Sequence, residues 1–284
     1  METMQWVRGT LLASAIGLLA ACGGGGGGSP GGGTTTPPTT PTTPPPPPYA
    51  PIPATDADAA RFLAQATFGP TTADIGRLRQ IGYSQWLDEQ LDDARTPPTL
   101  VLPRLQQAVA NGFPVADLRP QHRRNEWLWQ AANGRDQLRM RVAFALSEIF
   151  VVSDRDVADS NATIYRIADY QDTLARGAFG SYRGLLENVT LHPAMGYFLS
   201  HVGNRKADPA RNITPDENYG REVMQLFSIG LVERNRDFSP VLDASGQTTP
   251  TYDEKVVSAM ARVFTGWTYA GQTDAQFGRN NNTS

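Results

Sequence analysis

The sequence contains one cysteine and three histidines, which leaves little material for two common kinds of site. A single thiol forms no disulfide within the chain, and a structural zinc site usually takes four Cys or His ligands. The sequence also lacks the motifs of serine hydrolases, zinc proteases, P-loop NTPases and dinucleotide-binding enzymes. We therefore predict no metal ion and no cofactor.

Positive charge is not in excess. The chain has 25 Lys and Arg against 28 Asp and Glu, which gives a formal net charge of −3 at pH 7. A surface that binds nucleic acid needs a clustered excess of basic side chains. The composition therefore argues against nucleic acid as a partner.

An apolar run, TLLASAIGLLAA, occupies residues 10–21 near the N-terminus. It is too short to cross a bilayer and has the length of a signal-peptide core. The run ends in LAAC, which resembles the bacterial lipobox, where the cysteine is acylated before cleavage. We predict a signal peptide over residues 1–21 and a membrane anchor at acylated Cys22. The alternative is a chance cysteine beside an ordinary signal peptide.

Residues 23–53 consist mostly of Gly, Thr and Pro and carry no charged side chain. Because so few apolar side chains offset the entropy lost on ordering, we predict a disordered linker over residues 22–53. The alternative is a proline-rich ligand for a peptide-binding domain. Gly23 stands where an Asp would signal inner-membrane retention, so by resemblance we expect the outer membrane, with the globular part tethered by the linker.

From Thr55 onward the pattern is helical. Apolar residues recur at three- and four-residue spacing between Ser, Thr or Asp caps and Gly stops, and Gly82 is one such stop. Beyond Ser84 this pattern predicts helices over about 99–111, 121–133, 135–152, 160–176, 181–191, 193–201, 215–229 and 253–266. No run alternates as a strand does. We predict an all-α, multi-helix globular domain with long connecting loops over residues 54–284.

The helix from Arg135 to Ser153 is apolar on most of its circumference, which predicts burial on nearly all sides. A buried carboxylate such as Glu148 needs a partner or a proton. Arg141 lies two turns earlier on about the same side. We therefore predict a structural polar network of Arg141 and Glu148, and the alternative is a functional carboxylate.

Five segments carry a family resemblance: RFLAQATFGPT, LRMRVAFALSEIFVVS, TLHPAMGYFLS, DENYGREVMQLFSIGL and ARVFTGWTY. In this order they resemble the bacterial family DUF1800. The resemblance implies an exported, largely helical protein without an established activity. Members are commonly longer and often continue beyond TGW with segments that carry a His-Asp pair. Since this chain ends in GRNNNTS, we expect the domain to be incomplete at its C-terminus.

The segment TPDENYGREVMQLFSIG, residues 214–230, concentrates polar residues ahead of an apolar stretch. Thr214 to Glu217 read T-x-x-E with Pro second, which predicts a capping box that starts a helix at Pro215. Gly220 lies inside that helix at a cost of roughly 1 kcal/mol relative to Ala, which indicates close approach by a backbone or a ligand.

Two functions remain open. The first is a lipid-anchored cell-envelope scaffold or binding protein, with an envelope protein or a polysaccharide as partner. The alternative is an envelope hydrolase or other enzyme with Glu222 as general acid or base. In that case Asn218 and Arg221 would hold a polar or anionic group, and His192 would lie nearby.

Overall fold

The computed structural model describes residues 51–154 and 161–270, which belong to a compact unit that begins at Tyr49. The predicted signal peptide, Cys22 and residues 23–50 of the predicted linker lie outside the described residues. Among the described residues, no helix is both long and apolar enough to cross a membrane.

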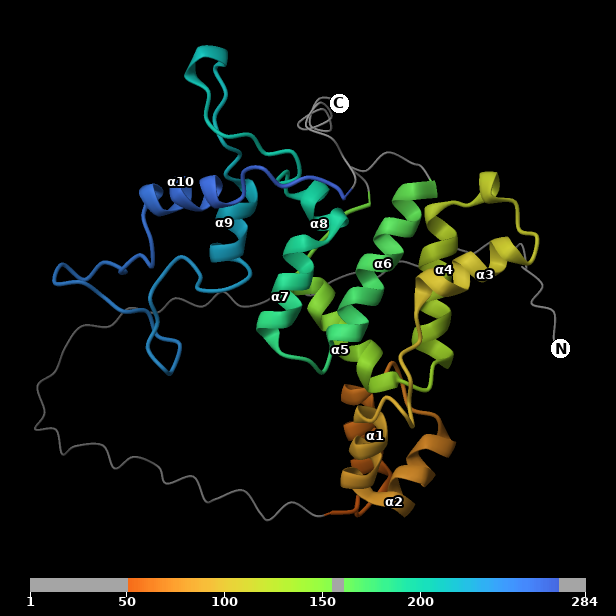
Figure 1. Ribbon diagram of the computed structural model, residues 1–284. Coiled ribbons are helices and arrows are strands. Elements are labelled where there is room, and N and C mark those ends of the chain that lie inside the picture. Colours follow the sequence, from red (N-terminus) through yellow and green to blue (C-terminus); the bar gives the residue numbers. More distant parts are fainter. Residues whose placement is uncertain (1–50, 155–160, 271–284) are drawn as a thin grey trace, which may run out of the picture. The chain divides into compact units, whose positions relative to one another are not determined.

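The described residues form ten α-helices and two short 3-10 helices, and contain isolated β-bridges but no strand (Figure 1). The α-helices are α1 Asp56–Ala66, α2 Thr72–Leu91, α3 Val101–Ala110, α4 Pro120–Asn133, α5 Gln137–Ile149, α6 Asn161–Gly177, α7 Tyr182–Leu191, α8 Pro193–Phe198, α9 Asn218–Gln225 and α10 Glu254–Val263. The 3-10 helices are Val115–Asp117 and Pro209–Arg211. The prediction of an all-α fold is confirmed.

Local caps explain where the first two helices begin. The hydroxyl of Thr55 accepts a hydrogen bond from the backbone N–H of Asp58, and Thr71 does the same for Asp74. In both cases the Asp side chain accepts from the cap residue's N–H in return, which completes a capping box. These starts depend on residues three apart, so the sequence alone predicts them.

Gly82 divides α2 into two parts. Its φ of 78° is left-handed, and a Cβ at this position would lie 2.7 Å from the carbonyl oxygen of Pro51. The backbone N–H of Tyr83 donates to that same oxygen at 3.1 Å. Only glycine fits such a bend against a second backbone. The predicted helix stop at Gly82 is confirmed, although the second part of α2 follows at once.

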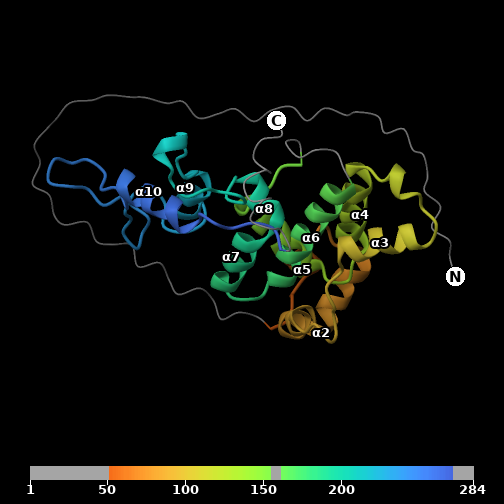
Figure 2. The same cartoon turned by 45° about the horizontal axis from the view of Figure 1, so that its top comes forward.

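Helix α6 lies at the centre of the helical body. It contacts α3, α4, α5, α7 and α8, and both views show these helices around it (Figures 1 and 2). The largest apolar cluster includes Tyr170 and Leu174 of α6 together with Phe150, Met195 and Tyr219. A smaller cluster joins α1 to α2, and a third joins α3 to α6.

Helix α5 is less buried than its sequence predicts. Its buried residues are Arg139, Met140 and Ala143, whereas Ile149 is 44% exposed. Arg139 donates to the carbonyl oxygen of Ala175 at 3.0 Å and forms an ion pair with Asp93. The buried face therefore contains a paired arginine, and the prediction of burial on nearly all sides is wrong.

The predicted network of Arg141 and Glu148 is not formed. Glu148 is exposed, so its carboxylate is solvated and needs no buried partner. Arg141 instead donates from Nε to the carbonyl oxygen of Gln65 at 3.3 Å, and its guanidinium lies 5.4 Å from the ring centroid of Phe68. Arg141 ties α5 to the end of α1.

A long connection joins α9 to α10. Its backbone folds into three segments that exchange hydrogen bonds: Glu233 N–H donates to Thr249, Thr249 N–H to Val241, and Val241 N–H to Glu233, each at 2.9 Å. Most residues of the connection over 231–250 are exposed, although Val241 and Thr249 are half-buried. Long connecting loops, as predicted, are present.

Candidate functional site

Helix α9 begins at Asn218, three residues later than predicted. The side chain of Asp216 accepts the N–H of Asn218 at 2.8 Å, and Thr214 makes no cap. The cause is Asn204, which lies outside the segment. Its side chain accepts from Asp216 N–H at 2.7 Å and donates to the Asp216 carbonyl oxygen at 3.1 Å, so Asn204 holds both backbone polar groups of Asp216 ahead of α9. The predicted capping box of Thr214 and Glu217 is wrong.

Gly220 marks the contact between α9 and α10. A Cβ there would lie 3.1 Å from the backbone nitrogen of Ala261 and 3.3 Å from the carbonyl carbon of Met260. The sequence predicted close approach by a backbone or a ligand, and the structure shows a backbone. Gly220 is therefore explained by helix packing.

Arg221 is held in an ion-pair network at the rim of α9 and α10. Its Nη2 lies 2.9 Å from Oε2 of Glu217 and 2.7 Å from Oε1 of Glu254. The second oxygen of Glu217 accepts from the hydroxyl of Ser258 at 2.9 Å. Hydrogen bonds to Glu254 and Glu217 raise the pKa of Arg221. The guanidinium thus already has two carboxylate partners.

Glu222 and Asn218 differ sharply in environment. Oε2 of Glu222 is buried and has no hydrogen-bond partner among the described residues. Asn218 is exposed, and no described residue bonds to its side chain. An unpaired buried carboxylate oxygen is costly, so Glu222 still requires an explanation that the rest of α9 does not.

His192 caps α8. It is 6% exposed, and its Nδ1 accepts the N–H of Ala194 at 3.1 Å, which leaves the proton on Nε2 beside Oδ2 of Asp169 at 3.3 Å. Burial lowers the pKa of His192, and the carboxylate of Asp169 partly offsets this. Among the described residues, His192 forms no hydrogen bond or ion pair with Asn218, Arg221 or Glu222.

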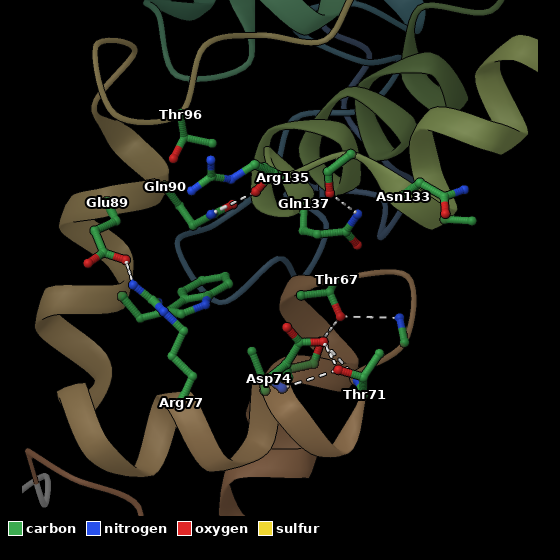
Figure 3. Close-up of a pocket in the computed structure, with 15 residues that line it drawn as sticks. Thr67, Thr71, Asp74, Arg77, Glu89, Gln90, Thr96, Asn133, Arg135 and Gln137 are labelled. Carbon is green, nitrogen blue, oxygen red and sulfur yellow. Dashed lines mark hydrogen bonds and ion pairs between the residues drawn. The ribbon is translucent and has the colours of Figure 1, made fainter. Parts of the chain in front are cut away.

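A polar cavity of about 420 Å³ lies elsewhere, between α1, the two parts of α2 and the α4–α5 connection (Figure 3). The bend at Gly82 turns the second part of α2 back, so that Arg77 reaches Glu89 across it at 2.6 Å. The side chain of Gln90 donates to the carbonyl oxygen of Arg135 at 3.0 Å and accepts from Leu138 N–H at 3.1 Å. These contacts join α2 to the start of α5.

The charges in this cavity balance. Its lining has two cationic side chains, Arg77 and Arg135, and two carboxylates, Asp74 and Glu89, and most of the remaining polar lining is uncharged. Burial raises the pKa of Glu89, but hydrogen bonds from Arg77 and Gln85 outweigh this and hold it below the ordinary value. The cavity therefore has no net charge to select a strongly ionic ligand.

Several polar groups of the cavity are unused. The guanidinium of Arg135 extends between Thr96 and Gln90, and no described residue pairs with it (Figure 3). The indole N–H of Trp86 likewise donates to no described residue, while the ring packs edge-on against Phe62 with centroids 5.3 Å apart. A rigid aromatic ring with open donors around it suits a ligand rich in oxygen acceptors.

The sequence prediction missed this cavity, because capping explains Thr71 and Asp74 and the other polar residues look like helix surface. One signal was present. Gln90 follows Trp86 by four residues and so lies on the same helix face. It is only 8% exposed, and a polar residue on an apolar face indicates a specific partner.

In the described part of the chain, no three His, Cys, Asp or Glu residues are grouped to hold a metal ion.

Comparison with known families shows to which family the chain belongs. One family model, described as protein of unknown function (DUF1800), matches residues 61–284. The chain belongs to the DUF1800 family. No curated protein and no solved structure matches it. The resemblance drawn from the five motifs is thereby confirmed. The DUF1800 match includes both the polar cavity and α9, so family membership does not choose between these two sites.

Proposed function

We propose that this DUF1800 protein is a lipid-anchored binding protein of the bacterial cell envelope, and that its polar cavity binds an envelope polysaccharide. The open groups around the cavity support this most directly. Arg135 and Trp86 offer donors, the side-chain oxygen of exposed Asn133 is unoccupied, and positive and negative charges balance. A sugar presents many hydroxyl oxygens and an apolar face, and aromatic rings with neutral polar groups recognise both.

The anchor rests on the sequence. LAAC places Cys22 at the end of the apolar run, and the Gly/Pro/Thr stretch that follows would hold the globular part away from the membrane surface. Acylation supplies several lipid chains at one residue, which stable anchoring requires. Labelling cells with an alkyne analogue of palmitate should modify the wild-type protein and not Cys22→Ala. Equal labelling of both would refute the anchor.

Binding is tested with the full-length chain in phosphatidylcholine nanodiscs. Titration calorimetry with soluble peptidoglycan fragments and with a neutral hexose oligosaccharide should give saturable binding. Arg135→Gln should weaken it about tenfold, the loss expected for one hydrogen bond from a charged donor. Arg135 is exposed and has no described protein partner, so the variant should keep the wild-type melting temperature.

The matched control is Arg211→Gln, which removes an exposed guanidinium 3.5 Å from Asp208, outside the cavity. It should bind both ligands as the wild type does. Absence of saturable binding to either saccharide, or equal losses in the Arg135 and Arg211 variants, would rule out the cavity as the binding site.

A second candidate function, an enzyme centred on Glu222, is favoured by one observation: the unpaired, buried Oε2. We propose Glu222 as its acid or base, with Asn218, Arg221 and His192 around the ligand. Envelope-type substrates should then be turned over by the wild type and not by Glu222→Gln. Glu187→Gln on α7 is the control, since Glu187 is exposed. Equal activity in both variants would exclude this site.

A further inference from the structure

Two more cavities meet between α4, α5 and α6. The smaller, of about 170 Å³, is lined by Trp127, Ala143, Phe144, Ser147, Gln171 and Leu174. The larger, of about 310 Å³, shares Ser147, Gln171 and Leu174 and extends to Phe150, Ile167 and Tyr170, with Arg123, Arg124 and Asp154 among its other lining residues. We call the pair the α4–α6 groove.

The inner part of the groove is apolar. The rings of Trp127 and Phe144 lie 5.8 Å apart and form its wall with Leu174. Two hydroxyls nearby are already used, since Ser147 donates to the Phe144 carbonyl oxygen and Tyr170 to that of Phe150, both at 2.7 Å. With these groups paired, the wall offers a ligand mainly aromatic and aliphatic carbon.

The outer part of the groove is cationic. Arg123 is 5% exposed, and its guanidinium contacts Asp154 at 2.5 Å and the Gln171 side-chain oxygen at 2.9 Å. Arg124 contacts the same Asp154 oxygen at 3.1 Å. Among the described residues, two guanidinium groups thus share one carboxylate, and one positive charge has no carboxylate partner of its own.

Arg124 is the group that remains available. Its side chain is 49% exposed, and only Nη1 has a described partner. The other donors of its guanidinium form a planar fork that matches a carboxylate or a phosphate. Arg123, by contrast, is fixed by two partners and holds Asp154 and Gln171 in place beside the groove.

We propose that the α4–α6 groove binds an anionic amphiphile, with its alkyl chain along Trp127, Phe144 and Leu174 and its carboxylate or phosphate at Arg124. A hydrocarbon without a charge would leave the cationic end unused. A small anion without a chain would meet a half-exposed arginine already shared with Asp154, and exposed ion pairs contribute little. Only a molecule with both parts uses the whole groove, because burial of its alkyl chain adds to the contact of its headgroup with Arg124. This site is separate from the polar cavity.

The test uses the full-length chain in phosphatidylcholine nanodiscs and three probes with the same terminally brominated alkyl chain. One ends in a carboxylate, one in a phosphate and one in a neutral alcohol. Bromine quenches only nearby indole rings, so Trp127 reports occupation of the inner groove, and Trp127→Phe gives the background. Both anionic probes should quench saturably, and the alcohol should bind about tenfold more weakly. Quenching by only one anion would identify the headgroup and keep the proposal.

Three variants complete the test. Arg124→Gln should remove the preference for anionic probes, while Arg124→Lys should keep part of it. Ala143→Leu should weaken all three probes by filling the smaller cavity, and its melting temperature shows whether it folds. Arg211→Gln is the control and should bind as the wild type. The proposal is overturned by equal affinity for alcohol and anions, by an unchanged preference in Arg124→Gln, or by quenching that does not saturate.

Discussion

Asp172 on α6 caps the first turn of α3, because its Oδ1 accepts the backbone N–H of Val101 at 2.7 Å. Its Oδ2 accepts the next N–H, that of Leu102, at 3.0 Å. The residue at the N-cap of α3 is Leu100, which has no side-chain acceptor. A carboxylate about 70 residues away in the sequence therefore does what a local Ser or Asp does for α1 and α2.

Removal of this carboxylate should destabilise the protein. Asp172→Ala leaves two amide groups without acceptors at a site that is 1% exposed, and we expect a loss of about 2 kcal/mol at pH 7. Asp172→Asn keeps one acceptor oxygen and carries no buried charge, so it should lose less than Asp172→Ala at pH 7. Urea unfolding followed by circular dichroism measures both. Equal losses in the two variants would contradict capping as the cause.

The same residue should make stability depend on pH. Burial raises the pKa of Asp172 to about 6 from an ordinary value of 3.8, against the opposing effect of the two backbone hydrogen bonds. A folded-state pKa above the unfolded value means that its contribution is fully present below about pH 4 and is lost as the pH rises through 6. Relative to Asp172→Asn, the wild type should lose on the order of 3 kcal/mol across that range.

Two histidines give the stability of the protein the opposite dependence on pH. Burial lowers the pKa values of His192 and His201, so their contributions are present above about pH 6.5 and are lost as the pH falls below that value. The difference in the free energy of unfolding between wild type and Asp172→Asn isolates the carboxylate, because the contributions of the two histidines cancel in it. If this difference stays constant from pH 4 to 7, Asp172 keeps its ordinary pKa.

Gly220 and Gly76 form a matched pair of helical glycines. A Cβ at Gly220 would lie 3.1 Å from the backbone of α10, whereas nothing lies within 4 Å at Gly76. Gly220→Ala should therefore destabilise by about 1–3 kcal/mol, because backbone yields poorly. Gly76→Ala should stabilise by about 0.5–1 kcal/mol through helix propensity alone. Chemical denaturation of both measures the contrast, and a stabilised Gly220→Ala would refute the close contact of α9 and α10.

The sequence predicts those features whose cause lies within a few residues. Thr71 and Asp74 are three apart and start α2, and Gly82 interrupts it. The predicted start of α9 is wrong because Asn204 acts from outside the segment. The predicted burial of α5 on nearly all sides is wrong because the apolar pattern does not reveal that Arg139 faces inward and donates to the Ala175 carbonyl oxygen. Periodicity predicts that a helix forms, but not which contacts it makes.

The candidate sites follow the same division. Residues 214–222 stand out in the sequence because polar groups are adjacent there. Arg221 nevertheless pairs with Glu254 as well as Glu217, and Glu217 accepts from Ser258, so the partners on α10 come after a long loop in the sequence. The polar cavity combines residues from α1, α2 and the α4–α5 connection, so no short segment contains it. Its one sequence signal is Gln90 on the face of Trp86.

Asn204 should control whether α9 is held against α10. It is 2% exposed, and its side-chain N–H groups donate to the carbonyl oxygens of Asp216 and Ala261 while its oxygen accepts from Asp216. Asn204→Asp keeps the acceptor but turns a carboxylate toward two carbonyl oxygens, so we expect a loss of about 2–3 kcal/mol, at least as large as that of Asn204→Ala.

Hydrogen exchange of the α9 amides gives a local measurement. In Asn204→Asp, protection of the Arg221 and Leu226 amides, which donate to the carbonyl oxygens of Glu217 and Glu222, should fall more than that of α4 and α6. Asn188→Asp on the exposed face of α7 is the control and should change neither. Uniform loss of protection over all helices would mean that Asn204 supports the whole fold, whereas a loss confined to α9 and α10 is what the hydrogen bonds of its side chain to Asp216 and Ala261 predict.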